Sequence, residues 1–344
     1  MVYFGTQINL IDMKVTLTEV ARAAGVSPST VSRILNGTAK VSPQKQGKVL
    51  ALIKKLDFKP DPAARALAGG RTSTVGVITQ FIDSPFYSEA LRGIEDVLSA
   101  ANYLPIFASG HWDEKTESHC VASLRQRKVD GLIALSSCLP DKVLAAISKE
   151  TPTIITGRRL SGANLNCVDF DNREASRLAV DHLLELGHRR IAYISGPMNH
   201  DDARDRLAGY RAALLGRVAP DPALIAEGDY TEQGGMAAMD RLLDSKVSFT
   251  AVCAGNDQMA FGAALALHRR GLHVPEHVSL VGFDDLPVSQ YLSPPLTTVR
   301  HSARELGARA ANAVLALIRG EASETAPLPS KLMVRESTLT AKTH

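Results

Sequence analysis

The spacing of hydrophobic and polar positions changes at about residue 72 of the chain. In the first part, apolar residues recur three and four positions apart in two short runs, which are Leu17, Val20, Ala21 and Ala24, then Val31, Ile34 and Leu35. This spacing gives each run one apolar helical face. Gly25 stands between the runs and supplies a turn. The pattern predicts two short helices that pack against each other.

The second short helix combines a strong start signal with a polar outer face. Ser27 is placed to cap it and Pro28 to occupy its first position. The positions that its apolar face leaves free are Ser29, Ser32, Arg33 and Asn36. An α-helix fits the major groove of DNA, where an arginine can donate two hydrogen bonds to guanine and hydroxyls reach phosphates or base edges. The two short helices therefore indicate a helix-turn-helix, although an ordinary helical hairpin on a larger domain has the same spacing.

A third helix is predicted from Ser42, as its cap, to about Leu56, with Pro43 at the first position. Its apolar residues can close a three-helix core, and they are Val49, Leu52, Ile53 and Leu56. Its lysines suit phosphates, and they are Lys45, Lys48, Lys54 and Lys55. Gly47 lies inside this helix at a cost of about 1 kcal/mol relative to alanine, which the pattern does not explain.

The stretch "KPDPAARALAGG" predicts one more short helix. Asp61 can cap it, Pro62 can begin it and Gly69–Gly70 can end it. Because an isolated helix this short is unstable in water, we expect it to form only when a partner copy or DNA holds it. Leu67 is a candidate wedge into the minor groove, where inserted apolar side chains kink a base step. In a plain helical linker the same leucine would only pack.

From Thr74 onward, short apolar runs alternate with amphipathic helical patterns. The predicted strands are "TVGVITQ", "YLPIFAS", "DGLIALSS", "TPTIIT", "RIAYISG", "AVCAG" and "VSLVGFDD". The predicted helices are "EALRGIEDVLSAA", "DKVLAAISKE", "REASRLAVDHLLELG", "ARDRLAGYRAALL", "GGMAAMDRLLDS" and "MAFGAALALHRRG". Two such series predict an α/β body of two lobes with parallel sheets. A small molecule is expected between the lobes, beyond the carboxyl ends of the strands.

Polar residues follow three of the predicted strands, as Ser136–Ser137, Asn256–Asp257 and Asp284–Asp285. Carboxylate, amide and guanidinium groups among aromatic side chains suit a polyhydroxylated ligand, because each hydroxyl both donates and accepts a hydrogen bond. Each of these residues could instead cap a helix, and for Asp257 and Asp285 we expect that role.

Composition excludes several classes of protein. In 344 residues, no apolar run approaches the roughly 20 residues that a membrane-spanning helix needs. The four cysteines are scattered singly, which argues against a zinc site or a disulfide framework and fits a reducing cytoplasm. The sequence offers no nucleophile–base pair, metal-ligand spacing or phosphate-cradling glycine loop. We therefore expect neither an enzyme nor a bound cofactor, and no membrane partner.

Charge separates the beginning of the chain from the rest. Residues 1–71 hold eleven Lys and Arg and four Asp and Glu, a net charge of +7, whereas the 28 basic and 32 acidic residues beyond give −4. A basic head on a mildly acidic body indicates a polyanionic partner for the head. Residues 1–13 read as a short tail rather than a signal peptide, and Met13 could be the initiator. The head and the missing export signal oppose the alternative of a periplasmic sugar-binding protein.

Several motifs in order make the chain resemble the LacI/GalR family of bacterial transcription regulators from about Lys14 to Leu339. "TLTEVARAAGVSPSTVSRILNG" matches the family's DNA-binding head and "ARALAGG" its hinge helix. "LGHRRIAYISGP", "RLAGYRAAL", "NDQMAFGA", "VPEHVSLVGFDD" and "PPLTTVR" match landmarks of its effector domain, which resembles periplasmic sugar-binding proteins. The galactose-repressor-like branch is the most similar.

The resemblance implies a homodimer that grips a pseudo-palindromic DNA operator and responds to a small effector. Induction by a sugar is the favoured mode, and corepression by a nucleobase is the alternative. The implied domains are a tail (1–13), a helix-turn-helix domain (14–60), a hinge helix (61–71) and an effector-binding domain (72–340). The lobes of the last are implied to span about 72–169 with 299–324, and about 170–298 with 325–340.

The resemblance and the polar face together give the expected site residues. Expected DNA contacts are Thr16, Pro28, Ser29, Thr30, Ser32, Arg33, Asn36, Ala64 and Leu67. Expected effector contacts are Phe86, Ser136, Arg158, Phe170, Arg206, Tyr230, Asn256 and Asp284. Pro28 stands where the family often has tyrosine or lysine, and it cannot make a polar base contact. Gly157 stands where sugar-binding relatives often have Asn or Asp, which leaves Arg158 as the polar contact.

Overall fold

The computed structural model describes residues 15–35, 39, 41–58, 71–219, 221–323 and 326–342. The chain forms two compact units, Met1–Thr72 and Ser73–His344, and each has its own internal packing. The predictions for the tail, the hinge helix with Ala64 and Leu67, and Asn36 lie outside the described residues.

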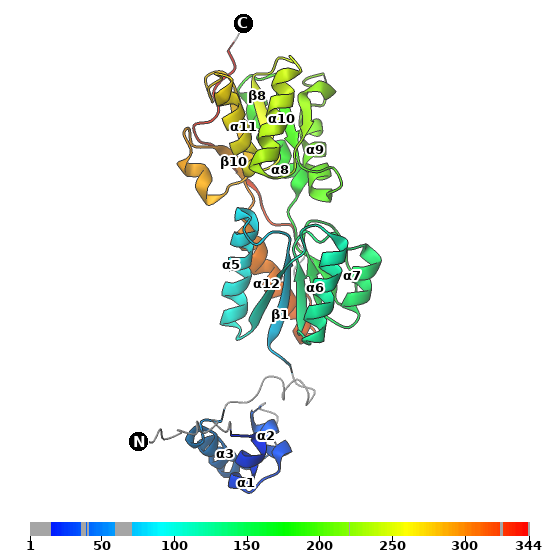
Figure 1. Ribbon diagram of the computed structural model, residues 1–344, viewed down its shortest axis with the longest axis vertical. Coiled ribbons are helices and arrows are strands. Elements are labelled where there is room, and N and C mark those ends of the chain that lie inside the picture. Colours follow the sequence, from blue (N-terminus) through cyan, green and yellow to red (C-terminus); the bar gives the residue numbers. More distant parts are fainter. Residues whose placement is uncertain are drawn as a thin grey trace, which may run out of the picture. The chain divides into compact units, whose positions relative to one another are not determined.

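The helices of the first unit are α1 (Leu17–Ala24), α2 (Pro28–Leu35) and α3 (Pro43–Lys55), drawn in dark blue in Figure 1. Thr16 caps α1 through a reciprocal capping box with Glu19. Gly25 ends α1 with φ 70°, a left-handed backbone that glycine adopts without steric cost. Ser27 then caps α2, because its hydroxyl accepts the backbone N–H of Thr30 at 3.2 Å.

A small apolar core holds these three helices together. Its buried residues are Val20, Ala21, Ala24, Val31, Ile34, Val49 and Phe58, and Leu52, Ile53 and Leu56 pack against them half-buried. The helix-turn-helix and the third helix that the sequence predicts are thus confirmed. Ser42 is the N-cap residue of α3 and Pro43 its first residue, as predicted, although the Ser42 side chain makes no capping hydrogen bond to a described residue.

Two parallel α/β lobes make up the second unit (Figure 1). The sheet of the first lobe has the order β2-β1-β3-β4-β5, and its neighbouring strands are all parallel. These strands are β1 (Thr74–Thr79), β2 (Leu104–Ser109), β3 (Gly131–Ala134), β4 (Thr153–Ile155) and β5 (Leu165–Cys167). Helices α5 (Pro85–Ala100) and α12 (Ala303–Arg319) cover one face, and α6 (Glu114–Gln126) and α7 (Asp141–Ser148) cover the other.

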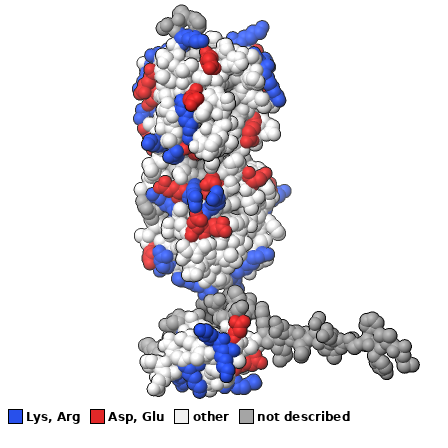
Figure 2. Space-filling model, turned by 90° about the vertical axis from the view of Figure 1, so that its left-hand side faces the viewer, with Lys and Arg blue, Asp and Glu red and all other residues white. Residues whose placement is uncertain are grey.

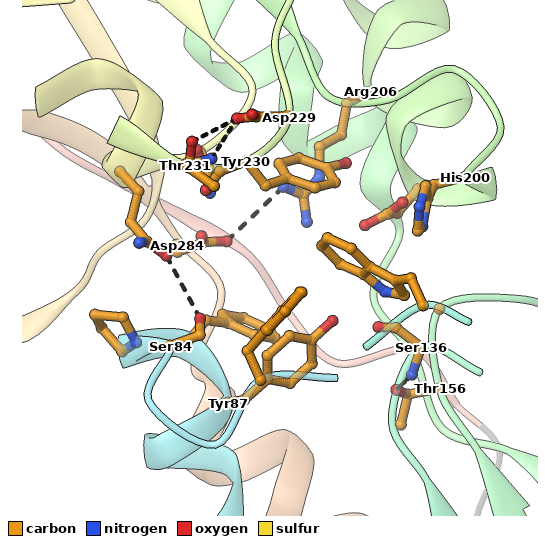
Figure 3. A pocket seen from close by; sticks show the side chains of 18 of the residues that line it. Ser84, Tyr87, Ser136, Thr156, His200, Arg206, Asp229, Tyr230, Thr231 and Asp284 are labelled. Carbon is orange, nitrogen blue, oxygen red and sulfur yellow. Dashed lines mark hydrogen bonds and ion pairs between the residues drawn. The ribbon is translucent and has the colours of Figure 1, made fainter. Parts of the chain in front are cut away.

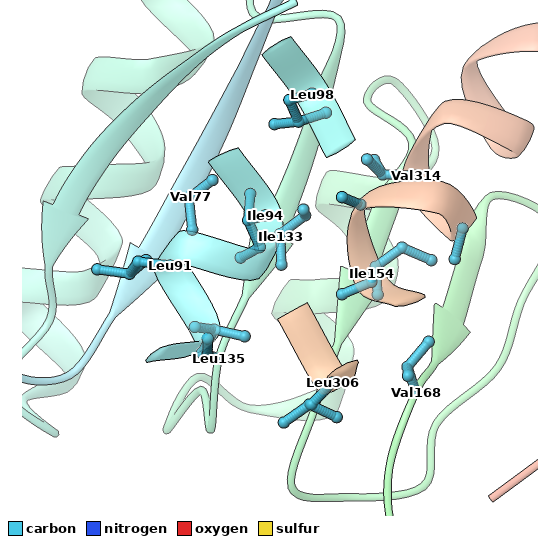
Figure 4. Packing of buried hydrophobic residues seen from close by; sticks show 14 of the residues in the cluster. Val77, Leu91, Ile94, Leu98, Ile133, Leu135, Ile154, Val168, Leu306 and Val314 are labelled. Atoms are coloured by element: carbon cyan, nitrogen blue, oxygen red, sulfur yellow. The ribbon is translucent and has the colours of Figure 1, made fainter. Parts of the chain in front are cut away.

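The core of the first lobe lies between its central strands and the α5–α12 pair (Figure 4). Val77 and Ile133 from the sheet meet Ile94 of α5 and Val314 of α12 in one buried cluster. The two helices approach closely at Gly307, where an added Cβ would lie 1.9 Å from the Ala90 carbonyl oxygen. Only glycine fits this position, because a side chain there would push the helices apart.

The sheet of the second lobe has the order β11-β10-β9-β8-β6-β7, parallel except for the antiparallel edge strand β11. Its strands are β6 (Ile191–Ser195), β7 (Ile225–Glu227), β8 (Ala251–Ala254), β9 (Ser279–Asp284), β10 (Thr297–Arg300) and β11 (Lys331–Met333). Helices α8 (Asn172–Glu185) and α9 (Asp201–Leu214) cover one face. Helices α10 (Glu232–Asp244) and α11 (Asp257–Arg269) cover the other. The predicted two-lobed α/β body is confirmed.

The chain crosses between the lobes three times: after β5, after β10 and after α12. Strand β10 pairs with β9 along its whole length, so the second crossing follows Arg300, slightly later than the expected boundary near residue 298. Because parallel strands of both sheets end toward these crossings, the loops after the strands face each other from the two lobes.

Candidate functional site

A cavity of about 460 Å³ lies between the two lobes, and Figure 3 shows it from close by. Ser84, Tyr87 and Ser136 face it from the first lobe, and Arg206 and Asp284 face it from the second. The Ser84 hydroxyl of the first lobe donates to Gln258 Oε1 of the second at 3.4 Å, which joins the two sides. The volume and position suit a small molecule held by both lobes.

Arg206 of α9 is fixed at the base of the cavity by several contacts. Its Nε donates to Asn172 Oδ1 at 2.8 Å, and its Nη1 donates to the Gly255 carbonyl oxygen at 2.6 Å. Its guanidinium lies 4.0 Å from the centre of the Phe283 ring. The buried cation is therefore held by hydrogen bonds and an aromatic face before any ligand arrives.

Asp284 is the last residue of β9, and its backbone has a left-handed φ of 105°. This conformation is rare outside glycine and turns the carboxylate into the cavity. Burial raises the pKa of Asp284 well above its ordinary value, and the nearby Arg206 opposes that rise. One carboxylate oxygen, Oδ1, is buried and accepts no hydrogen bond from any described residue. Such an oxygen is ready to accept one from a ligand hydroxyl.

Aromatic side chains form the walls of the cavity, and they are Phe81, Phe86, Tyr87, Trp112, Phe170 and Tyr230. Trp112 of the first lobe meets His200 of the second edge to face, with ring centres 4.7 Å apart. The Trp112 indole N–H and the Tyr230 hydroxyl are buried and have no hydrogen-bond partner in the described part of the chain. Burial raises the pKa of Tyr230 well above its usual range, so its hydroxyl keeps its proton.

Gln80 supports the wall of the first lobe from behind. This fully buried side chain accepts the backbone N–H of Trp112 at 2.6 Å and donates to the carbonyl oxygens of Leu135 and Ser136. Trp112 and Ser136 both have a left-handed backbone, with φ 52° and 50°. The glutamine therefore stabilises two loops whose conformations are unfavourable by themselves. Gln80 was not predicted, because no pattern marks a single buried amide.

Seven of the eight expected effector contacts line this one cavity: Phe86, Ser136, Phe170, Arg206, Tyr230, Asn256 and Asp284. The eighth, Arg158, lies outside it, on an adjoining cavity of about 270 Å³. Its guanidinium donates to the Leu139 carbonyl oxygen and pairs with Asp141 at 3.1 Å. These contacts correct the expectation that Arg158 reaches the main site, because they hold the side chain elsewhere.

The expected helix-cap roles of Asp257 and Asp285 are wrong. Asn256 caps α11, with its Oδ1 accepting the Met259 backbone N–H at 2.9 Å, while its amide donates to the Tyr230 carbonyl oxygen. Asp257 instead accepts three hydrogen bonds, from the Leu286 backbone N–H and the hydroxyls of Ser289 and Thr298. Asp285 pairs with two arginines, Arg300 and Arg335. Both aspartates thus fix loops of the second lobe.

Several lining residues were not predicted, and they include Trp112, Asp169, Asn172, His200, Asp202 and Asp229. Apart from Trp112, these residues follow the end of a strand or begin the next helix, so the strand-end rule could have found them. His301 does not line the cavity: it stacks on Phe170 at 3.8 Å between ring centres, and burial lowers its pKa well below its ordinary value. It supports the wall from behind.

The outer face of α2 presents most of the expected DNA contacts. Pro28, Ser29 and Arg33 are exposed, and Thr30 and Ser32 are half-buried. The Thr30 hydroxyl is engaged with Ser27 at 2.8 Å. Thr16 is exposed beside α1, where it caps the helix. Figure 2 shows several Lys and Arg side chains over the middle and lower part of the visible face of this unit. All four α3 lysines that the sequence singles out are exposed.

Other kinds of site are missing from the part of the chain that the structure describes. No helix there is long and apolar enough to cross a membrane. Within the same residues, no group of three or more His, Cys, Asp or Glu side chains could hold a metal ion. The four cysteines are free thiols.

Family models match both units of the chain. Residues 16–61 match the model of bacterial regulatory proteins of the lacI family, and residues 180–338 match a periplasmic binding protein-like domain. The two matches correspond to the three-helix unit and to the greater part of the second lobe with its crossings. They join a DNA-binding head to a ligand-binding body in one chain.

Full-length relatives give the same result. The chain is 36% identical to the HTH-type transcriptional regulator GalR of Escherichia coli (strain K12) over 94% of each protein. The crystal structure of the Lac repressor dimer bound to operator and the anti-inducer ONPF has a TM-score of 0.81 at 32% identity, covering 94% of this chain and 99% of that one. The complex of the transcriptional regulator CelR with cellobiose has a TM-score of 0.70 at 35% identity and the same coverage. The predicted resemblance is confirmed: the chain belongs to the LacI family of bacterial regulatory proteins, and it is a DNA-binding transcriptional regulator rather than an enzyme.

Proposed function

We propose that this regulator represses carbohydrate-utilisation genes and that a sugar or sugar derivative in the cavity between the lobes controls its affinity for DNA. It acts as a homodimer in the cytoplasm, with one three-helix head on each half of a pseudo-palindromic operator. The ligand changes the free-energy difference between an operator-binding and a releasing state, and such couplings are typically about 1–3 kcal/mol.

One observation carries the proposal of a polyhydroxylated ligand. Three buried polar atoms on lining residues have no hydrogen-bond partner among the described residues: Asp284 Oδ1, the Tyr230 hydroxyl and the Trp112 indole N–H. Asp284 Oδ1 can accept a hydrogen bond, the indole N–H can donate one, and the Tyr230 hydroxyl can do either. A sugar presents hydroxyls that both donate and accept, and its C–H faces pack on aromatic rings such as Phe86 and Phe170.

The relatives support both halves of the proposal. The solved Lac repressor is a dimer bound to operator DNA and to ONPF, and the solved CelR holds cellobiose. Because the present chain aligns with both over nearly its whole length, we assign its operator and effector roles by the same division of units. We assign DNA contacts to Thr16, Pro28, Ser29, Thr30, Ser32, Arg33, Asn36, Ala64 and Leu67.

A nucleobase corepressor is the second candidate. The aromatic lining favours it, because a planar base stacks on rings such as those of Trp112 and Tyr230. The two candidates predict opposite signs: a sugar inducer weakens operator binding, whereas a corepressor strengthens it.

The test uses the full chain and a duplex selected from a random-sequence pool. We expect one sugar of a panel of pentoses, hexoses and disaccharides to lower the affinity for the selected duplex at constant salt. Strengthening by a purine base would support the second candidate. Selection of no preferred duplex would contradict both, since the three-helix unit would then lack sequence specificity.

A further inference from the structure

The charges around the cavity between the lobes are strongly unequal. Its lining includes six carboxyl groups, which are Asp83, Asp169, Asp202, Asp229, Glu232 and Asp284. Among the described residues that line it, Arg206 is the one lysine or arginine. His200 also lines it, but burial lowers the pKa of His200, so the ring is neutral at pH 7.

The single arginine is not available to neutralise a ligand. Two of its N–H groups are donated to Asn172 and Gly255, and its guanidinium lies 3.8 Å from the Asp284 carboxylate. The Asp284 carboxyl group is thus the acidic neighbour of Arg206 within the cavity. None of the other five carboxyl groups forms an ion pair with a described residue.

The carboxyl groups already oppose one another's ionisation. Burial raises the pKa of Asp169 to about 6, and the charge of Asp202 adds to that rise. The same Asp202 contributes to the raised pKa of Asp284, after burial. A phosphate or carboxylate placed among these groups would add repulsion that no cation on the lining relieves.

We infer that the effector carries no phosphate or carboxylate group, and that the cavity selects neutral or amine-bearing polyhydroxylated molecules. The inference rests on the proposed function, because it concerns the ligand of the same site. Carboxylates accept hydrogen bonds from hydroxyls and ammonium groups alike, so both kinds of ligand satisfy the lining.

The adjoining smaller cavity is the place where an anionic ligand could meet arginine side chains. Arg158 and Arg204 line it together with the carboxylates of Asp201 and Asp202. The residues that it shares with the main cavity are Trp112, Ser136, Thr156, Gly157, His200 and Asp202. Each arginine has a carboxylate partner, Asp141 for Arg158 and Asp201 for Arg204. A phosphorylated ligand that reached into this smaller cavity would contradict the inference, and Arg158→Gln would then weaken its binding.

The fluorescence of Trp112 reports occupancy directly, because Trp112 is the only tryptophan of the chain and lines both cavities. The probes are matched sets: galactose, galactosamine, galacturonate and galactose 6-phosphate, with the glucose counterparts. We expect a neutral or amino member to bind and its anionic counterparts to bind at least about 100-fold more weakly, since a like-charge contact is strongly unfavourable. An anionic member that binds as tightly as its neutral counterpart overturns the inference.

Two further experiments distinguish a failure of the inference from a failure of the proposed function. Asp202→Asn is expected to reduce the discrimination against the 6-phosphate, whereas Asp205→Asn, an exposed change on the same helix that does not line the cavity, is expected to leave it unchanged. Equal effects of the two variants would count against the inference. Inorganic phosphate alone is expected to leave Trp112 emission unchanged, and a saturable change would overturn the inference. If no sugar of either kind binds, the proposed function fails and the inference with it, whereas tight binding of an anionic sugar overturns the inference and leaves the proposed function intact.

Discussion

The guanidinium of Arg206 lies 3.8 Å from the carboxylate of Asp284, and both side chains are almost completely buried. The two residues come from α9 and from the end of β9, so their pairing joins two elements of the second lobe at the cavity. A buried pair of this kind costs much to desolvate, and its partners depend on each other. This dependence gives the pair a structural role in addition to its proposed contact with the effector.

Arg206→Ala should therefore destabilise the second unit more than Asp284→Asn does. Removing the arginine leaves a buried carboxylate without its cation and removes hydrogen bonds to Asn172 and Gly255. We expect a loss of about 3–5 kcal/mol in the free energy of unfolding, measured by urea denaturation. Asp284→Asn keeps the side-chain shape and should cost clearly less. Equal losses for the two variants would contradict the account of the pair.

Asp169→Asn should change how stability depends on pH. Burial raises the pKa of Asp169 to about 6, so between about pH 4 and 6 the folded state binds more protons than the unfolded state. The free energy of unfolding contributed by this group consequently falls as pH rises through that window. At pH 7.5 the asparagine variant should be more stable than the native chain by about 1–3 kcal/mol, and near pH 4 the two should be alike.

The measurement is urea denaturation at a series of pH values. Asp257, whose pKa burial also raises to about 6, keeps part of the pH dependence in the variant. If the difference in the free energy of unfolding between the variant and the native chain stays constant from pH 4 to 7.5, Asp169 ionises normally.

Gly47→Ala should stabilise the first unit. Gly47 is an exposed residue inside α3, and an added Cβ would have no neighbour within 4 Å. Alanine is favoured over glycine in a helix interior by about 1 kcal/mol, so slower amide exchange is expected for Leu52 and Ile53 in the full chain. Unchanged or faster exchange would mean that α3 is held by something other than its own helical preference. The matched change Gly25→Ala should destabilise, because φ there is 70°.

Arg33→Ala should reduce discrimination between the selected operator and random DNA. Arg33 is exposed on the outer face of α2, and a bidentate arginine–guanine contact contributes about 1–3 kcal/mol to base discrimination. Fluorescence anisotropy on both duplexes at one salt concentration measures the effect. Arg22→Ala, an exposed change on α1, serves as the control. Equal weakening on both duplexes would assign Arg33 to phosphate alone.

Most of the periodic elements could be predicted from the sequence, but two helices were missed. Helix α12 was missed even though Leu306, Ala310 and Val314 recur four positions apart on its buried face. Helix α6 was missed for a better reason: its buried face includes the charged Glu117, which accepts hydrogen bonds from Ser137 and Cys138. A buried carboxylate whose partners come from the next loop interrupts the apolar pattern that identifies a helix.

Site residues in recognisable motifs could be predicted, and single residues in loops could not. Arg206 and Asp284 could be predicted because they belong to motifs that the family resemblance carries. Trp112 could not, since it is one residue in a loop with φ 52°, held by a glutamine 32 positions earlier. Arg158 was misplaced because it was chosen in place of the Asn or Asp that sugar-binding relatives often have at the position of Gly157. The Leu139 carbonyl oxygen and Asp141 hold its guanidinium outside the main cavity.

The most direct test of ligand control is the anisotropy of a labelled operator duplex titrated with the native chain and with Asp284→Asn, each with and without the sugar that changes Trp112 emission. The account predicts equal operator affinity for the two proteins without sugar, and about 5- to 150-fold weaker binding with sugar for the native chain alone. An Asp284→Asn chain that releases the operator as the native chain does, or a native chain whose affinity the bound sugar leaves unchanged, would contradict it.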